Sequence, residues 1–111
     1  MMAEVKNNIV YITDSLPEEV IACQLAEECA ELAQAALKLY RCVSGDNPTL
    51  VRKDEAIKKI AEEFADVELA FNILSRKIGI RFGDVLKVYD EKTERWAFRL
   101  RGVQKNEVEK D

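Results

Sequence analysis

Two clusters of acidic residues lie in stretches of the chain that are otherwise apolar. In QLAEECAELAQAALKLY the acids are Glu27, Glu28 and Glu31, and in AEEFADVELAF they are Glu62, Glu63, Asp66 and Glu68. Like charges three or four residues apart repel one another on a helix. A helix that needed acids only for solubility would mix lysines among them. The two clusters therefore indicate a positively charged ligand.

The spacing inside each cluster places two carboxylates on one helix face. Glu28 and Glu31 are three residues apart, and so are Glu63 and Asp66. Residues at this spacing are neighbours on a helix surface. At about 100° per residue, each pair borders the apolar arc of its helix. Two antiparallel helices that pack along these arcs would turn the four carboxylates toward one pocket.

Such a pocket requires cations, because ionised carboxylates in a low-dielectric site either raise their pKa values or bind a metal ion. A ligand set made only of oxygen suits Mg²⁺ or Mn²⁺. The chain has no histidine, which argues against zinc and against a di-iron site built from Glu-x-x-His pairs. Mg²⁺ usually shares its coordination with substrate phosphates. This favours chemistry on a phosphate ester or phosphoanhydride.

Cations on a third predicted helix complement the acids, since Lys92, Arg95 and Arg99 fall on one stripe. They are suited to hold phosphate oxygens. Structural roles that involve no ligand remain open for all these charged residues. The first acid cluster could be a solvated helix face, Glu68 could pair with a basic residue of another helix, and the cations could simply favour a helix C-terminus.

The apolar spacing predicts three long helices over residues 17–41, 53–78 and 81–100. The inward faces expected for the first two are Leu25, Cys29, Leu32, Ala36 and Tyr40, then Ile57, Ile60, Ala61, Phe64, Val67, Phe71 and Leu74. The face expected for the third is Phe82, Val85, Leu86, Tyr89, Trp96 and Leu100. We predict an all-α fold, an antiparallel helical bundle that is completed by oligomerisation.

The segments between and beyond these helices have weaker patterns. Gly45 to Pro48 predict a loop, and Gly79 predicts the end of the second helix. Residues 1–14 contain the β-like run IVYI and suggest an N-terminal arm, either a lone strand or an extended segment. Residues 15–101 would form the helical domain. Residues 102–111 are charged and predict a frayed tail.

Length and composition exclude several classes of protein. A chain of 111 residues forms one domain at most and buries a modest share of its surface, so a partner chain is expected. A net charge of −4 argues against nucleic acid as the main partner. Three cysteines without a CxxC motif predict small buried residues in a reducing cytosol. Without a signal-peptide pattern or a membrane span, we expect a soluble, cytoplasmic protein.

The two acid clusters together resemble a family signature. Glu27-Glu28-Cys29-Ala30-Glu31 followed by Glu63-Phe64-Ala65-Asp66 is similar to the EExxE…ExxD motif of the MazG-like all-α nucleoside triphosphate pyrophosphohydrolases. The resemblance covers about residues 16–101. The segment between the half-motifs is somewhat longer than is usual in that family. The extra length falls in the predicted loop, over residues 43–54, which leaves substrate selection open.

The resemblance implies a four-helix assembly, often of two chains, that hydrolyses a nucleoside triphosphate to the monophosphate and pyrophosphate. It implies Mg²⁺ ligands at Glu28, Glu31, Glu63 and Asp66. It also implies that Glu27 orders or deprotonates the attacking water, that Lys92 and Arg95 meet phosphates, and that Asn72 contacts ribose or base. For Asn72 the alternative is a hydrogen-bonded core amide. The assembly would be a homodimer or homotetramer.

Two other functions fit the same sequence. A phosphoribosyl-ATP pyrophosphohydrolase shares the helical architecture and the acid motifs that the resemblance implies. A non-catalytic helical dimer that binds a partner would keep its acids only as surface charge, and it would not respond to Mg²⁺. Base and sugar specificity, and a role in removing damaged nucleotides as opposed to controlling a normal pool, stay open.

Overall fold

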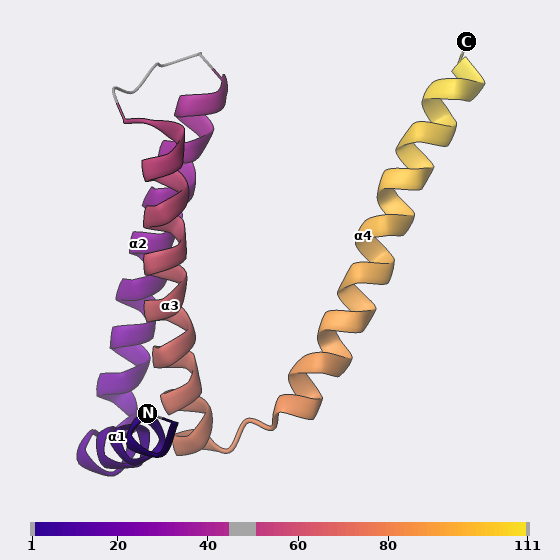
Figure 1. Ribbon diagram of the computed structural model, residues 1–111. Helices are drawn as coiled ribbons and strands as arrows, with labels where there is room; N and C mark the ends of the chain where they lie inside the picture. Colours follow the sequence, from indigo (N-terminus) through magenta and orange to yellow (C-terminus); the bar gives the residue numbers. More distant parts are fainter. Residues whose placement is uncertain (1, 45–50, 111) are drawn as a thin grey trace. The chain divides into compact units, whose positions relative to one another are not determined.

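The structure, a computed structural model, describes residues 2–44 and 51–110, with side chains as far as residue 102. Its helices are α1 (Met2–Ser15), α2 (Glu18–Ser44), α3 (Lys53–Ile78) and α4 (Phe82–Lys110), as Figure 1 shows. These described residues contain no strand, so the predicted all-α class is confirmed. Internal contacts divide the chain into two units, one through Gly79 and one from Ile80 onward.

Helices α2 and α3 pack side by side as an antiparallel hairpin (Figure 1). The buried and half-buried residues along this seam recur at alternating steps of four and three. On α2 they are Ile21, Leu25, Glu28, Leu32, Ala35, Leu39 and Cys42, and on α3 they are Ala56, Ile60, Glu63, Val67, Ala70 and Leu74. This 3.5-residue repeat is that of two-stranded coiled coils. Glu28 and Glu63 thus occupy seam positions that an apolar residue would normally fill.

The predicted inward faces are only partly correct. Leu25, Leu32, Ile60, Val67 and Leu74 lie on the seam as expected, and Phe71 is half-buried beside it. However, Cys29, Ala36, Tyr40, Ile57, Ala61 and Phe64 are exposed. These residues lie roughly 80–160° around each helix from the seam glutamate. Each helix therefore carries two adjacent apolar stripes, and periodicity alone does not decide which one is buried.

The predicted strand or extended arm at the N-terminus is wrong, because these residues form α1. Ile9 is buried in a core cluster with Ile21, Ile73 and Leu74, and Ile12 packs against that cluster. Figure 1 shows α1 crossing the end of the hairpin where α2 begins and α3 ends. Burial against α2 and α3 therefore outweighs the strand preference of the β-branched run.

Hydrogen bonds tie the end of α1 to itself and to α3. The hydroxyl groups of Thr13 and Ser15 donate to backbone carbonyls one turn earlier. The Lys77 ammonium donates to the carbonyl of Thr13 at 2.8 Å. Carbonyls in the last turn of a helix lack intrahelical partners. Lys77 therefore satisfies one of them and fastens α1 to the hairpin.

Helix α3 has the bounds that the sequence predicts, and its end at Gly79 is confirmed. Gly79 has a φ of 82° and its N–H donates to the carbonyl of Ser75 at 2.8 Å. Helix α2 extends three residues beyond its predicted end at residue 41. The loop predicted at Gly45 to Pro48 lies outside the described residues.

Helix α4 runs on to Lys110, so it includes the backbone of most of the charged tail predicted from residue 102. The apolar stripe expected to face inward is largely exposed: Phe82, Leu86, Tyr89, Trp96 and Leu100. Within its own unit, α4 has no second helix against which to bury this stripe.

Two expectations about surface chemistry have different outcomes. Cys23 and Cys29 are exposed, so the prediction that all the cysteines are buried is wrong, although Cys42 is half-buried and its thiol donates to the Val51 carbonyl. Across the described residues, none of the helices combines the length and the apolar character that a bilayer span requires.

Candidate metal centre

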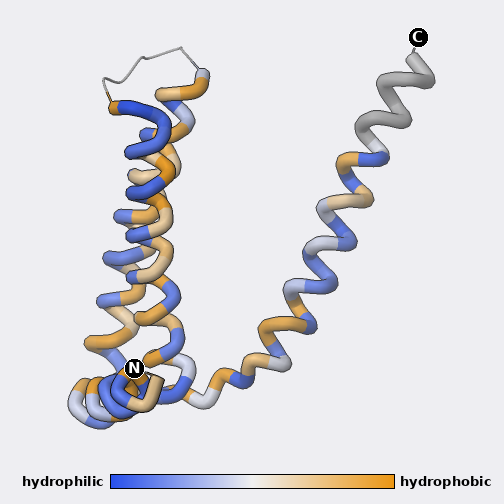
Figure 2. Tube along the Cα trace, viewed as in Figure 1, coloured by the Kyte–Doolittle hydropathy of each residue, from blue (hydrophilic) through white to orange (hydrophobic). Residues whose placement is uncertain are grey.

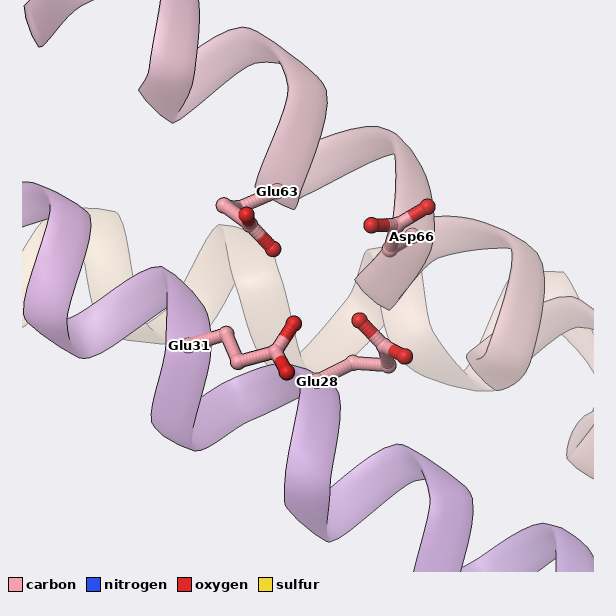
Figure 3. Close-up of side chains that lie close together, drawn as sticks. All are labelled: Glu28, Glu31, Glu63 and Asp66. Carbon is pink, nitrogen blue, oxygen red and sulfur yellow. The ribbon is translucent and has the colours of Figure 1, made fainter.

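Four carboxylates converge between α2 and α3. Glu28 and Glu31 come from α2, Glu63 and Asp66 from α3, and Figure 3 shows their carboxylates turned toward one another. One oxygen from each of the four lies within 4.8 Å of the others. The structure therefore brings together the two acid pairs that their three-residue spacing placed beside the helix seam.

The four acids differ in burial, which gives the centre a closed side and an open side. Glu63 is buried and Glu28 is half-buried on the hairpin seam. Glu31 and Asp66 lie three residues further along their helices and are exposed. A ligand held by all four groups would rest on the seam and still be reached from solvent.

Each seam glutamate has one carboxylate oxygen with a donor and one without. Gln24 Nε2 donates to Glu28 Oε1 at 2.7 Å, and Lys59 Nζ lies 2.8 Å from Glu63 Oε1. The Oε2 atoms of both glutamates are buried and have no hydrogen-bond partner. Only 6% of the surface of Glu63 is exposed. Buried carboxylate oxygens rarely remain unpaired in folded proteins, so these two atoms favour a cation as the ligand of the four acids.

Mutual repulsion is visible in the pKa values of the cluster. The negative charge of Glu28, followed by that of Glu63, raises the pKa of Glu31. The Lys59 hydrogen bond lowers the pKa of Glu63 despite its burial, and the same bond raises the pKa of Lys59. The Lys59 ammonium group neutralises the charge of one carboxylate in this group. The charges that remain make ionisation of Glu31 less favourable.

The Glu31→Gln substitution should flatten the pH dependence of stability in the metal-free protein. The unfolded chain ionises Glu31 near 4.5, whereas the folded protein keeps its proton to higher pH. The free energy of unfolding therefore falls as pH rises from 4.5 through the raised pKa. The variant lacks this fall, so it gains stability over wild type as pH rises above 4.5 and through the raised pKa of Glu31.

Urea unfolding in EDTA across this pH range measures the difference. Glu63 does not contribute to this pH dependence. Because its pKa is lowered, its effect on the free energy of unfolding falls at pH values below its ordinary pKa. Glu68→Gln changes an exposed acid of α3 outside the group of four, so its curve should run parallel to that of wild type. Parallel curves for Glu31→Gln as well would show that the four carboxylates do not interact in solution.

A pocket of about 260 Å³ adjoins the acid centre. Its lining is Glu31, Gln34, Ala35, Lys38, Lys59 and Glu63. A larger hollow of about 680 Å³ has described lining residues on α4 alone, Glu94, Arg95, Phe98, Arg99 and Arg101. Residues of one helix do not enclose a ligand, so the smaller pocket is the relevant one.

The other predicted site residues lie outside the group of four. Glu27 is exposed, accepts a weak hydrogen bond from the Cys23 thiol at 3.8 Å, and precedes Glu31 by one helical turn. Asn72 is exposed and accepts a hydrogen bond from Arg76 at 3.2 Å, so its interpretation as a core amide is wrong. Lys92 and Arg95 are exposed on α4, in the other unit.

Sequence analysis missed the donors that serve the acids. Gln24 stands four residues before Glu28, and Lys59 stands four residues before Glu63. Residues at this spacing meet on a helix surface. A search for a donor one turn before each seam acid would have found both.

Comparisons of this chain with protein-family models, with curated proteins and with solved structures found no match. The similarity of its acid motifs to the MazG-like signature therefore stays a prediction. The geometry and the chemistry of the acid centre carry the functional conclusion.

Proposed function

We propose that this chain hydrolyses a nucleoside triphosphate to the nucleoside monophosphate and pyrophosphate, with Mg²⁺ or Mn²⁺ held by the four acids. The observation that carries the proposal is the approach of the carboxylates to within 4.8 Å, with a buried unpaired oxygen on both Glu28 and Glu63. Oxygen ligands suit these hard cations. The exposed pair, Glu31 and Asp66, leaves the open side of the centre accessible to phosphate groups.

The residues of the chain divide the work of this reaction. When bound, Mg²⁺ neutralises phosphate charge and lowers the pKa of water. Glu27, one helical turn before Glu31, orders the attacking water and accepts its proton. The water oxygen bonds to the α-phosphorus, the bond to the bridging oxygen breaks, and pyrophosphate leaves. Lys92 and Arg95 meet the phosphates and Asn72 meets ribose or base, as the motif resemblance implies.

The same proposal includes assembly into a homodimer or homotetramer. Apolar residues remain uncovered on the hairpin, among them Ile57 and Phe64, and a second apolar stripe runs along α4. Figure 2 shows hydrophobic residues distributed along each helix. Apolar surface of this extent on a chain of 111 residues supports a bundle that is completed by another copy.

Release of pyrophosphate from a panel of nucleoside triphosphates with Mg²⁺ tests this function. The panel contains canonical and modified nucleotides and phosphoribosyl-ATP. Wild type should turn over at least one nucleoside triphosphate, and Glu28→Gln should lose roughly a hundredfold or more of that rate because a half-buried charged ligand is removed. Glu68→Gln, at an exposed acid outside the group of four, should retain the rate.

The other outcomes of the same panel are distinct. Turnover of phosphoribosyl-ATP alone would assign the chain to that hydrolysis instead. Absence of turnover on every substrate, together with no rise in the unfolding midpoint on adding Mg²⁺, would leave a non-catalytic helical dimer.

A further inference from the structure

The pocket beside the acid centre is lined by charges of both signs. Lys38 and Gln34 reach it from α2, and Lys59 reaches it from α3. Glu31 and Glu63 line the same pocket and also belong to the acid centre. The pocket and the centre therefore share two carboxylates. A cation that binds at the centre must change the electrostatic potential in the pocket.

Lys59 forms an ion pair with the acid centre. Its ammonium group lies 2.8 Å from Glu63 Oε1, while Glu63 Oε2 is buried without a partner. The Lys59 side chain is 54% exposed, whereas that of Glu63 is 8% exposed. The lysine tip can therefore swing away without unpacking the seam, but the carboxylate cannot follow it.

We propose that Lys59 is the resident counter-ion of the metal-free centre, and that a divalent cation displaces it toward Lys38 to form a phosphate subsite. This inference rests on the proposed function. A divalent ion on Glu63 repels an ammonium group a few ångströms away. Two lysines and two carboxylates line the pocket, so their formal charges cancel and an anion gains no net attraction. A cation that neutralises the carboxylates leaves both lysines available.

The size and the hydrogen-bond donors of the pocket suit phosphate groups. A volume of about 260 Å³ holds roughly eight waters at about 30 Å³ each. Pockets for whole drug-sized ligands are larger, roughly 300–1,000 Å³. The amide of Gln34 and the two ammonium groups supply donors, which phosphate oxygens accept. Inorganic pyrophosphate is therefore a suitable probe.

Calorimetric titration of the full chain tests the exchange without measuring turnover. Wild type should bind pyrophosphate in saturating Mg²⁺ and not in EDTA. Lys59→Met should bind Mg²⁺ about threefold more tightly, because an exposed competing ion pair is removed. The same variant should bind pyrophosphate roughly tenfold more weakly in Mg²⁺, because a charged donor is lost. General damage to the fold would weaken both ligands instead.

Variants of two further lysines distinguish cation binding from pyrophosphate binding. Lys38→Met should weaken pyrophosphate binding and leave Mg²⁺ affinity unchanged. Lys58→Met, at the exposed neighbour of Lys59, should change neither. Lys59→Gln keeps a polar side chain and should reproduce both effects of Lys59→Met. It replaces Lys59→Met in the experiment in case the methionine variant folds poorly.

The results that would contradict the displacement of Lys59 by a divalent cation differ from those that would contradict the proposed hydrolysis. Unchanged or weaker Mg²⁺ binding in both Lys59 variants, or equal pyrophosphate binding with and without Mg²⁺, would show that Lys59 is not displaced. Absence of Mg²⁺ binding by wild type would remove the metal centre itself, and the exchange with it.

Discussion

Replacement of Glu28 and Glu63 together by leucine should raise the thermal unfolding midpoint of the metal-free protein and abolish its response to Mg²⁺. Both residues occupy seam positions in a 3.5-residue repeat, where leucine packs well. Both leave a carboxylate oxygen buried and unpaired. Replacing buried charged groups by apolar residues of similar volume is often neutral or stabilising. For a chain this short, we expect a rise of roughly 5 °C or more.

Circular dichroism melts in EDTA and in Mg²⁺ measure both parts of this result. Wild type should melt at a higher temperature with Mg²⁺, because a ligand of the folded state stabilises it. The control pair, Glu62→Leu with Glu68→Leu, changes exposed acids of α3, so it should gain nothing from burial and should keep the Mg²⁺ response. A lower midpoint for the seam variant in EDTA would mean that Glu28 and Glu63 stabilise the hairpin without a ligand. That result would contradict the proposal that they form a cation-binding centre.

The convergence of the four acids could be predicted because it depends on local spacing. A spacing of three residues places both partners on one face of a helix, and position relative to apolar neighbours places that face at the seam. The end of α3 could be predicted for the same reason, since Gly79 adopts a positive φ that few other residues tolerate. Neither feature requires knowledge of distant residues.

The features that could not be predicted depend on contacts distant in sequence. The run around Ile9 has strand propensity, and it becomes helical because Ile73 and Leu74, far along the chain, cover it. Similarly, Phe64 and Val67 are both apolar, yet Phe64 is exposed and Val67 lies on the seam. The choice between them follows from the partner helix, because two neighbouring apolar stripes satisfy the same periodicity.

The uncovered stripe also gives a means of testing the assembly. Ile57 and Phe64 lie on one side of α3, and Cys29 and Ala36 lie at a similar angle from the seam on α2. In an antiparallel pair, equal offsets from the seam fall on the same side of the hairpin. The two stripes therefore form one apolar face. Residues of the acid centre that flank the seam, Glu31 among them, lie on the opposite side, so a second copy can cover the apolar face without blocking the centre.

In the proposed assembly, Phe64→Asp should separate the copies and leave the mass of one 12.7 kDa chain. Phe64 is 54% exposed, and a carboxylate buried there by a partner would lose its hydration without gaining a counter-ion. We expect the dissociation constant to rise about a hundredfold, as for a central interface residue. Light scattering over a range of concentrations measures it. Leu69→Asp, at a 44% exposed leucine on the opposite side of α3, should leave the mass unchanged. A single-chain mass for wild type, or equal dissociation by both variants, would show that this face has a different role.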